Sequence, residues 1–108
     1  MLIKMESNGG ESKIDDRFTT TLKDFQTYNL ALNTWVDTNI SASKAKALVM
    51  YLSTAHEYAG VWILDNGTIK AISRRPVIDV KIENGTIWIE QVLSASVLAF
   101  NVAIWGDN

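Results

Sequence analysis

The sequence contains no cysteine, only one histidine and one proline, and no long apolar run. Without cysteine, disulfides, thiolate metal sites and thiol nucleophiles are excluded. The longest apolar stretch, 58–64, has seven residues, whereas a membrane-spanning helix needs about 20. The opening "MLIKMESNGGESK" lacks the apolar segment of a secretory signal. We therefore expect a protein that folds in the cytoplasm and has no membrane partner.

Charge of either sign is sparse and evenly spread. Ten basic and twelve acidic residues give a net charge of −2, and no basic stripe is present that would neutralise a row of phosphates. We therefore expect no nucleic-acid partner. The length of 108 residues and the hydrophobic content of 47% indicate one globular domain with a modest core.

Residue patterns that carry chemistry are also missing. His56 stands beside Glu57, but neighbours on a strand point to opposite faces and no motif marks a nucleophile, so we interpret His56 as a polar loop residue. The acidic pair at 15–16 is not followed by further oxygen ligands, and the glycines at 9–10 lack the rest of a phosphate loop. The arginines at 74–75 are typical of a solvated loop. The sequence therefore predicts no enzyme, no metal site and no cofactor.

Two similar turns are the strongest local signal. Residues 65–72 read "DNGTIKAI" and residues 83–90 read "ENGTIWIE". Asn-Gly between apolar-alternating flanks predicts a β-hairpin with a type I′ turn, because Asn and Gly tolerate positive φ best. We expect both hairpins to lie in one antiparallel sheet, with Lys70 facing solvent and Trp88 facing a partner.

Most of the remaining chain also has the pattern of short strands. Alternating or β-branched segments occur at 17–22, 27–33, 60–64, 68–73, 77–83, 86–90 and 96–105. Residues 37–43 are interpreted as a polar loop, and Pro76 as the start of a strand. The sequence predicts an all-β, single-domain antiparallel sandwich, jelly-roll-like, with about seven or eight strands. The domain spans 17–108, and 1–16 is predicted to be a flexible arm because 6–16 is polar and Gly-rich.

Residues 44–58 fit two interpretations. Apolar residues at Ala45, Leu48 and Leu52 have helical spacing, and Ser43 is a suitable cap. In contrast, "ALVMYL" is a compact apolar run among strands. We favour a strand over 45–53, with a short helix within 44–58 as the alternative.

The last predicted strand, 96–105, is apolar on both faces. Such a strand is central and is covered on both sides, by its own chain or by a partner. Four tryptophans in this short chain add to the apolar surface. The candidate interface residues are Trp88, Trp105, Val97 and Ala99, together with Leu2, Ile3 and Met5 of the arm. Three roles stay open for the tryptophans: covering the sandwich edge, anchoring a protein interface, or stacking on a sugar ring.

The segments "LIKMESNGG", "KALVMYL", "AGVWILDNGTIKAIS" and "LAFNVAIWG" together resemble small virion-associated proteins from the tail regions of phages and prophages of Gram-positive bacteria. The resemblance implies a small β-sandwich that is a non-enzymatic part of a virion, with head, tail and fibre roles all open. It assigns no functional residue. We therefore expect a structural protein that self-associates as a homo-oligomer or docks on other virion proteins. The alternative is a carbohydrate- or receptor-binding module that presents exposed aromatics to a glycan.

Overall fold

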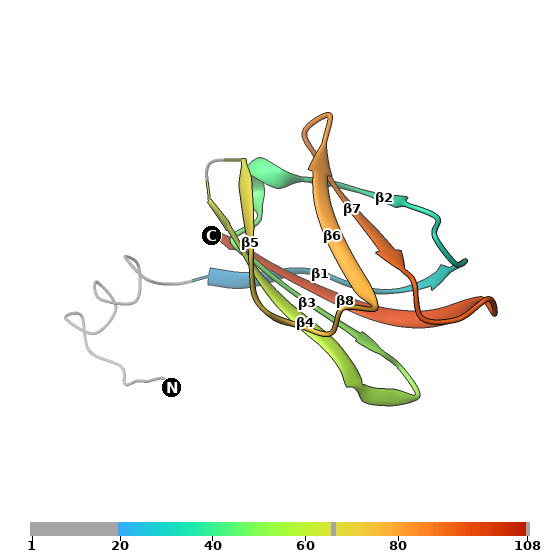
Figure 1. The fold of residues 1–108 in the computed structure, drawn as a ribbon. Helices are drawn as coiled ribbons and strands as arrows, with labels where there is room; N and C mark the ends of the chain where they lie inside the picture. Colours follow the sequence, from blue (N-terminus) through green and yellow to red (C-terminus); the bar gives the residue numbers. More distant parts are fainter. Residues whose placement is uncertain (1–19, 66, 108) are drawn as a thin grey trace, which may run out of the picture.

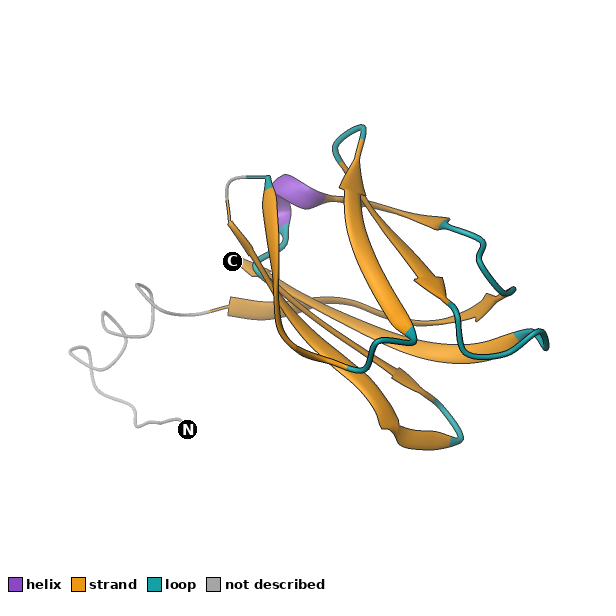
Figure 2. Cartoon of the chain, viewed as in Figure 1, coloured by secondary structure: helices purple, strands orange, loops and turns teal. Residues whose placement is uncertain are grey.

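The computed structural model describes residues 20–65 and 67–107, so the predicted arm lies outside the described residues. Its elements are β1 (Thr20–Leu30), β2 (Val36–Ser41), a 3-10 turn η1 (Ala42–Lys44), β3 (Ala47–Leu52), β4 (Ala55–Asp65), β5 (Thr68–Arg74), β6 (Ile78–Glu83), β7 (Thr86–Gln91) and β8 (Leu98–Asp107). Figure 2 shows η1 as the one helical piece of this described part. No helix within it has the length and hydropathy of a bilayer span.

The strands form two antiparallel sheets that pack as a sandwich (Figure 1). The five-stranded sheet has the order β1-β8-β3-β4-β5, and the three-stranded sheet has the order β2-β7-β6. The first strand pairs with the last, the second with the seventh and the fourth with the fifth, which is the nested order of a jelly roll. The third and sixth strands depart from it, since β3 pairs with β4 and β8, and β6 with β7. The predicted all-β, jelly-roll-like sandwich is confirmed.

The core lies between the two sheets and follows the period of two along each strand. The buried apolar side chains are Leu30, Leu48, Met50, Leu52, Trp62, Leu64, Ile78, Val80, Ile87, Ile89, Phe100, Val102 and Ile104. Each large side chain buried in this way stabilises the fold by roughly 1.5–3 kcal/mol. Period-two alternation predicts an inward face over 78–82, 87–89 and 98–104. Its members are in this list except Ile82 and Leu98, which are partly buried and pack against the core.

The ambiguous segment 44–58 is β-structure, so the helical alternative is wrong and the strand interpretation is confirmed. Leu48, Met50 and Leu52 point into the core, while Val49 and Tyr51 are only half-buried. β3 is hydrogen-bonded to β4 on one side and to β8 on the other. These two pairings, one with the next strand and one with the distant β8, outweigh the weak helical propensity of a short alanine-containing segment.

The predicted polar loop at 37–43 is wrong, because most of it forms β2 and its end forms η1. Thr38 is buried, and its hydroxyl donates a hydrogen bond to the carbonyl oxygen of Ile87 at 2.8 Å. Asn39 has φ of 63°, and the register with β7 is irregular around it. Pairing with β7 therefore makes a strand from residues whose composition is typical of a loop.

The two strands predicted at 17–22 and 27–33 are parts of one strand: residues 20–22 and 27–30 both belong to β1. β1 runs from Thr20 to Leu30, with an irregular register between Leu22 and Asp24. The pattern of the second segment is still respected, since Leu30 is buried and Asn29 is exposed.

Both predicted hairpins are present, but they lie in different sheets. β4 and β5 belong to the five-stranded sheet, whereas β6 and β7 belong to the three-stranded sheet. Gly67 has φ of 79°, and Asn84 and Gly85 have φ of 51° and 80°, as a type I′ turn requires at its two central positions. The expectation of one shared sheet is wrong, because each hairpin pairs with a different neighbour.

Candidate functional site

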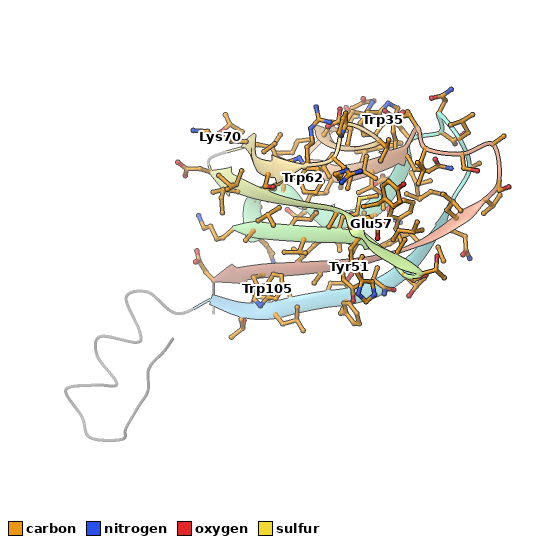
Figure 3. The ribbon with its side chains drawn as sticks, turned by 60° about the horizontal axis from the view of Figure 1, so that its bottom comes forward. Trp35, Tyr51, Glu57, Trp62, Lys70 and Trp105 are labelled. Carbon is orange, nitrogen blue, oxygen red and sulfur yellow. The ribbon has the colours of Figure 1, made fainter. Side chains whose placement is uncertain are left out.

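The strand β8 is central, as its apolar pattern predicts. It lies between β1 and β3 and is hydrogen-bonded to both. Phe100, Val102 and Ile104 point into the sandwich, so Ala103 and Trp105 point to the opposite side of the sheet. Figure 3 looks toward this outer side, with Trp105 and Tyr51 labelled on it.

Cross-strand pairing gathers apolar side chains from four neighbouring strands on this outer side. One row joins Leu22, Trp105, Ala47 and Ile63, and the next joins Phe25, Ala103, Val49 and Val61. We call these eight residues the apolar face. Leu22, Phe25 and Ile63 are 53%, 55% and 42% exposed. Within residues 20–65 and 67–107, no element packs over this face.

The third row of the same side is more polar. The Thr27 hydroxyl donates to Asn101 Oδ1 at 2.6 Å. Tyr51 and His56 meet edge to face, with ring centroids 5.1 Å apart. His56 is exposed at the start of β4 and not in a loop, as its sequence neighbours suggested. The polar row bounds the apolar face at one end.

The outer side of the three-stranded sheet carries a different group of side chains. Trp35, Lys81 and Trp88 meet there, and we call them the tryptophan–lysine cluster. Lys81 Nζ lies 4.5 Å from the ring centroid of Trp35 and 5.6 Å from that of Trp88. Lys81 is also 2.7 Å from the Glu83 carboxylate, and Trp88 Nε1 donates to the Glu83 carbonyl oxygen at 3.1 Å. Cation–π contacts and hydrogen bonds therefore hold the cluster together.

Carboxylates surround this cluster. Asp37 pairs with Trp88 across β2 and β7, and Asp79 pairs with Glu90 across β6 and β7. Partial burial raises the pKa of Glu90, the negative charge of Asp79 raises it further, and Lys81 opposes both effects. Both burial and the neighbouring carboxylate therefore disfavour the charged form of Glu90.

The predicted interface residues do not form one surface. Trp88 and Trp105 lie on the outer sides of different sheets, and Ala99 lies beside Asn29 on the side of the apolar face. Val97 is 62% exposed in the loop before β8. Leu2, Ile3 and Met5 lie outside the described residues.

Several residues of the apolar face and of the tryptophan–lysine cluster were not predicted from the sequence. On the apolar face these are Leu22, Phe25, Ala47, Val49, Val61 and Ile63, and in the cluster they are Trp35 and Lys81. The outward residues of β3 and β4 are themselves apolar, which is a signal for a second covered face. In the sequence, only the last strand was predicted to be covered on both faces. For Trp35 and Lys81, no local signal exists, since their contact depends on the pairing of three strands.

Comparison with known protein families, curated protein sequences and solved structures finds no match to this chain. No group of three or more His, Asp or Glu side chains that would hold a metal ion occurs in the described part of the chain. Function is therefore inferred from the chemistry of the two outer surfaces.

Proposed function

We propose that this protein is a non-enzymatic structural component that self-associates through the apolar face. The observation that carries the proposal is the exposure of Leu22, Phe25 and Ile63 on one side of a sheet whose other side is the core. Monomers seldom expose a contiguous apolar patch of several hundred Å² without using it. Removing the patch from water favours association by about 25 cal/mol for each Å² of apolar surface.

A second copy of the chain is the partner that fits this face best. Four strands about 4.8 Å apart span roughly 19 Å, and the two rows cover about four residues, or roughly 13 Å, along each strand, which gives about 250 Å² as a plane. Side-chain relief increases this area, and the neighbouring polar row on the same side of the sheet would extend the contact toward the roughly 1,000 Å² that a specific interface needs. Ala47 and Ala103 in the middle of the face let a second sheet approach closely, as in face-to-face sheet packing. Symmetric dimers are also the commonest oligomers.

The resemblance to small virion-associated proteins supports placing this association in a phage or prophage particle. In that setting the homo-oligomer is the building unit, and other virion proteins are further partners. The low net charge of −2 is compatible with a role in protein packing and gives no support to nucleic-acid binding.

Sedimentation of the full chain at micromolar concentrations tests the proposal. We expect the wild type to be a dimer or larger, and Trp105→Glu to be a monomer, since it places a charge in the middle of the contact. Trp88→Glu is the matched control, because it makes the same change on the other sheet and should leave the oligomer intact.

A wild type that stays monomeric throughout this concentration range would defeat the proposal. Equal dissociation by Trp105→Glu and Trp88→Glu would defeat it as well, because the apolar face would then have no special role. Circular dichroism of each variant shows that the sandwich is still folded.

A further inference from the structure

The outer side of the three-stranded sheet holds two tryptophans that take no part in the core. Trp62 is 2% exposed and belongs to the core, whereas Trp35 and Trp88 are only half-buried. Trp35 precedes β2 and Trp88 lies in β7, yet both rings lie close to the same ammonium group of Lys81. Large aromatic side chains at a surface are typical of binding sites when their rings are held in place.

The cluster is held in place before any ligand arrives. The hydrogen bond from Trp88 Nε1 to the Glu83 carbonyl oxygen ties the indole to the neighbouring strand. The Glu83 carboxylate, 2.7 Å from Lys81 Nζ, restrains the lysine between the two rings. A ligand that binds here loses little free energy to the ordering of protein side chains.

The charges around the cluster select the class of ligand. The carboxylates on this side are Asp37, Asp79, Glu83 and Glu90, and the nearby cations are Lys81 and Arg74. The negative excess disfavours phosphates, nucleic acids and anionic lipids. A cationic ligand would have to displace Lys81 from its place beside the rings. A neutral, hydroxyl-rich ligand is not disfavoured by the charge of the carboxylates, and its oxygens can accept hydrogen bonds from Lys81, so it does not have to replace that cation.

The geometry points to a neutral saccharide as this ligand, and we propose that the tryptophan–lysine cluster is its binding site. The C–H face of a pyranose ring stacks on an indole, its hydroxyls donate to the carboxylates of Asp37 and Glu90, and its oxygens accept from Lys81. The site does not rest on self-association. Because it lies on the sheet opposite to the apolar face, a dimer formed through that face leaves it open to a glycan.

A glycan array followed by isothermal titration tests the site. The full chain is first screened on neutral and charged glycans, and then titrated with the best neutral oligosaccharide and with chitohexaose and cellohexaose as fixed probes. We expect a dissociation constant below the millimolar range for a neutral oligosaccharide. Trp35→Ala and Trp88→Ala should each weaken it by about tenfold or more, because each removes a stacking surface.

The matched control is Trp105→Ala, which removes the same type of side chain from the opposite sheet and should leave the affinity unchanged. A soluble oligosaccharide is used so that a change in oligomeric state does not alter the apparent affinity through multivalency. Lys81→Met, which keeps the aliphatic stem and removes the donor, should weaken binding severalfold.

Three results would overturn the proposal: no neutral oligosaccharide binds at millimolar concentration, only charged glycans bind, or Trp105→Ala weakens binding as much as Trp88→Ala. If circular dichroism shows that Trp88→Ala is unfolded, Trp35→Ala decides, because Trp35 lies outside the strands and its loss is expected to be tolerated.

Discussion

The two sheets have similar inner faces and contrasting outer ones. Inside, both present buried aliphatic side chains, such as Leu48 and Ile104 from one sheet and Ile87 and Ile89 from the other. Outside, the five-stranded sheet presents the flat apolar face, and the three-stranded sheet presents the tryptophan–lysine cluster among carboxylates. The core of a sandwich lies between its inner faces, so the composition of the outer faces is less constrained by folding and can serve binding.

This contrast indicates a division of tasks between the two sheets. An apolar face with small residues in its middle suits contact with another sheet, where water is excluded and no partner charge is needed. A cluster of aromatic rings with donors and acceptors suits a polar ligand that exchanges hydrogen bonds with water. In our proposals the five-stranded sheet therefore makes the assembly and the three-stranded sheet binds the glycan.

The largest expected effect on stability concerns the two hairpin turns, one in each sheet. Gly85→Val should lower the free energy of unfolding by about 2 kcal/mol and Gly67→Val by about 1 kcal/mol, because valine is strained at positive φ. The larger cost at Gly85 follows from its carbonyl oxygen, which accepts a hydrogen bond from the Ala42 amide at 2.9 Å and ties the turn to η1. Urea unfolding measures both values.

An added Cβ meets no atom within 4 Å at either glycine, so the comparison isolates the backbone. Equal losses would show that the tie between Gly85 and Ala42 contributes nothing. Wild-type stability in both variants would contradict the assignment of the two turns.

A smaller effect compares two lysines, one in each hairpin. Lys81 is the cross-strand partner of Trp88, and Lys70 stands where Trp88 stands in the other hairpin. Lys81→Met should lower the free energy of unfolding by about 0.5–1 kcal/mol through loss of its cation–π contacts. Lys70→Met, at an exposed position of β5, should change it by less. The same loss at both positions in thermal unfolding would mean that the cluster does not stabilise the fold.

The smallest effect concerns Glu90 and depends on pH. Its pKa is raised above the ordinary value of 4.5, first by partial burial and then by Asp79, so its charged form is disfavoured in the folded state. The cost is absent below pH 4.5, where the carboxyl is protonated in both folded and unfolded chains, and it develops as the pH rises through the raised folded pKa. Glu90→Gln should therefore raise the melting temperature slightly at pH 7 and leave it unchanged at pH 3. A rise of equal size at both pH values would point to a cause other than titration.

Local patterns predicted a large part of this fold. The Asn-Gly pairs predicted both turns, because positive φ is a property of one or two residues and their neighbours do not change it. Period-two alternation predicted the inward side chains of 78–82, 87–89 and 98–104, because alternate residues of a strand always point to opposite faces. The double apolar pattern of 96–105 predicted a central strand, and β8 is central in its sheet.

Strand pairing, in contrast, was decided only in the tertiary structure. Hydrogen bonding to β7 made a strand of the polar segment that begins at Asp37, and separate pairing placed the two hairpins in different sheets. The same pairing put Trp88 and Trp105 on opposite sides of the molecule and brought Trp35 to Lys81. The side chain of a residue takes its direction from its own strand, but its neighbours come from strands that are distant in the chain. The side of the strand to which a residue points is therefore determined by the local sequence. Which residues of other strands lie beside it is determined only by the tertiary structure.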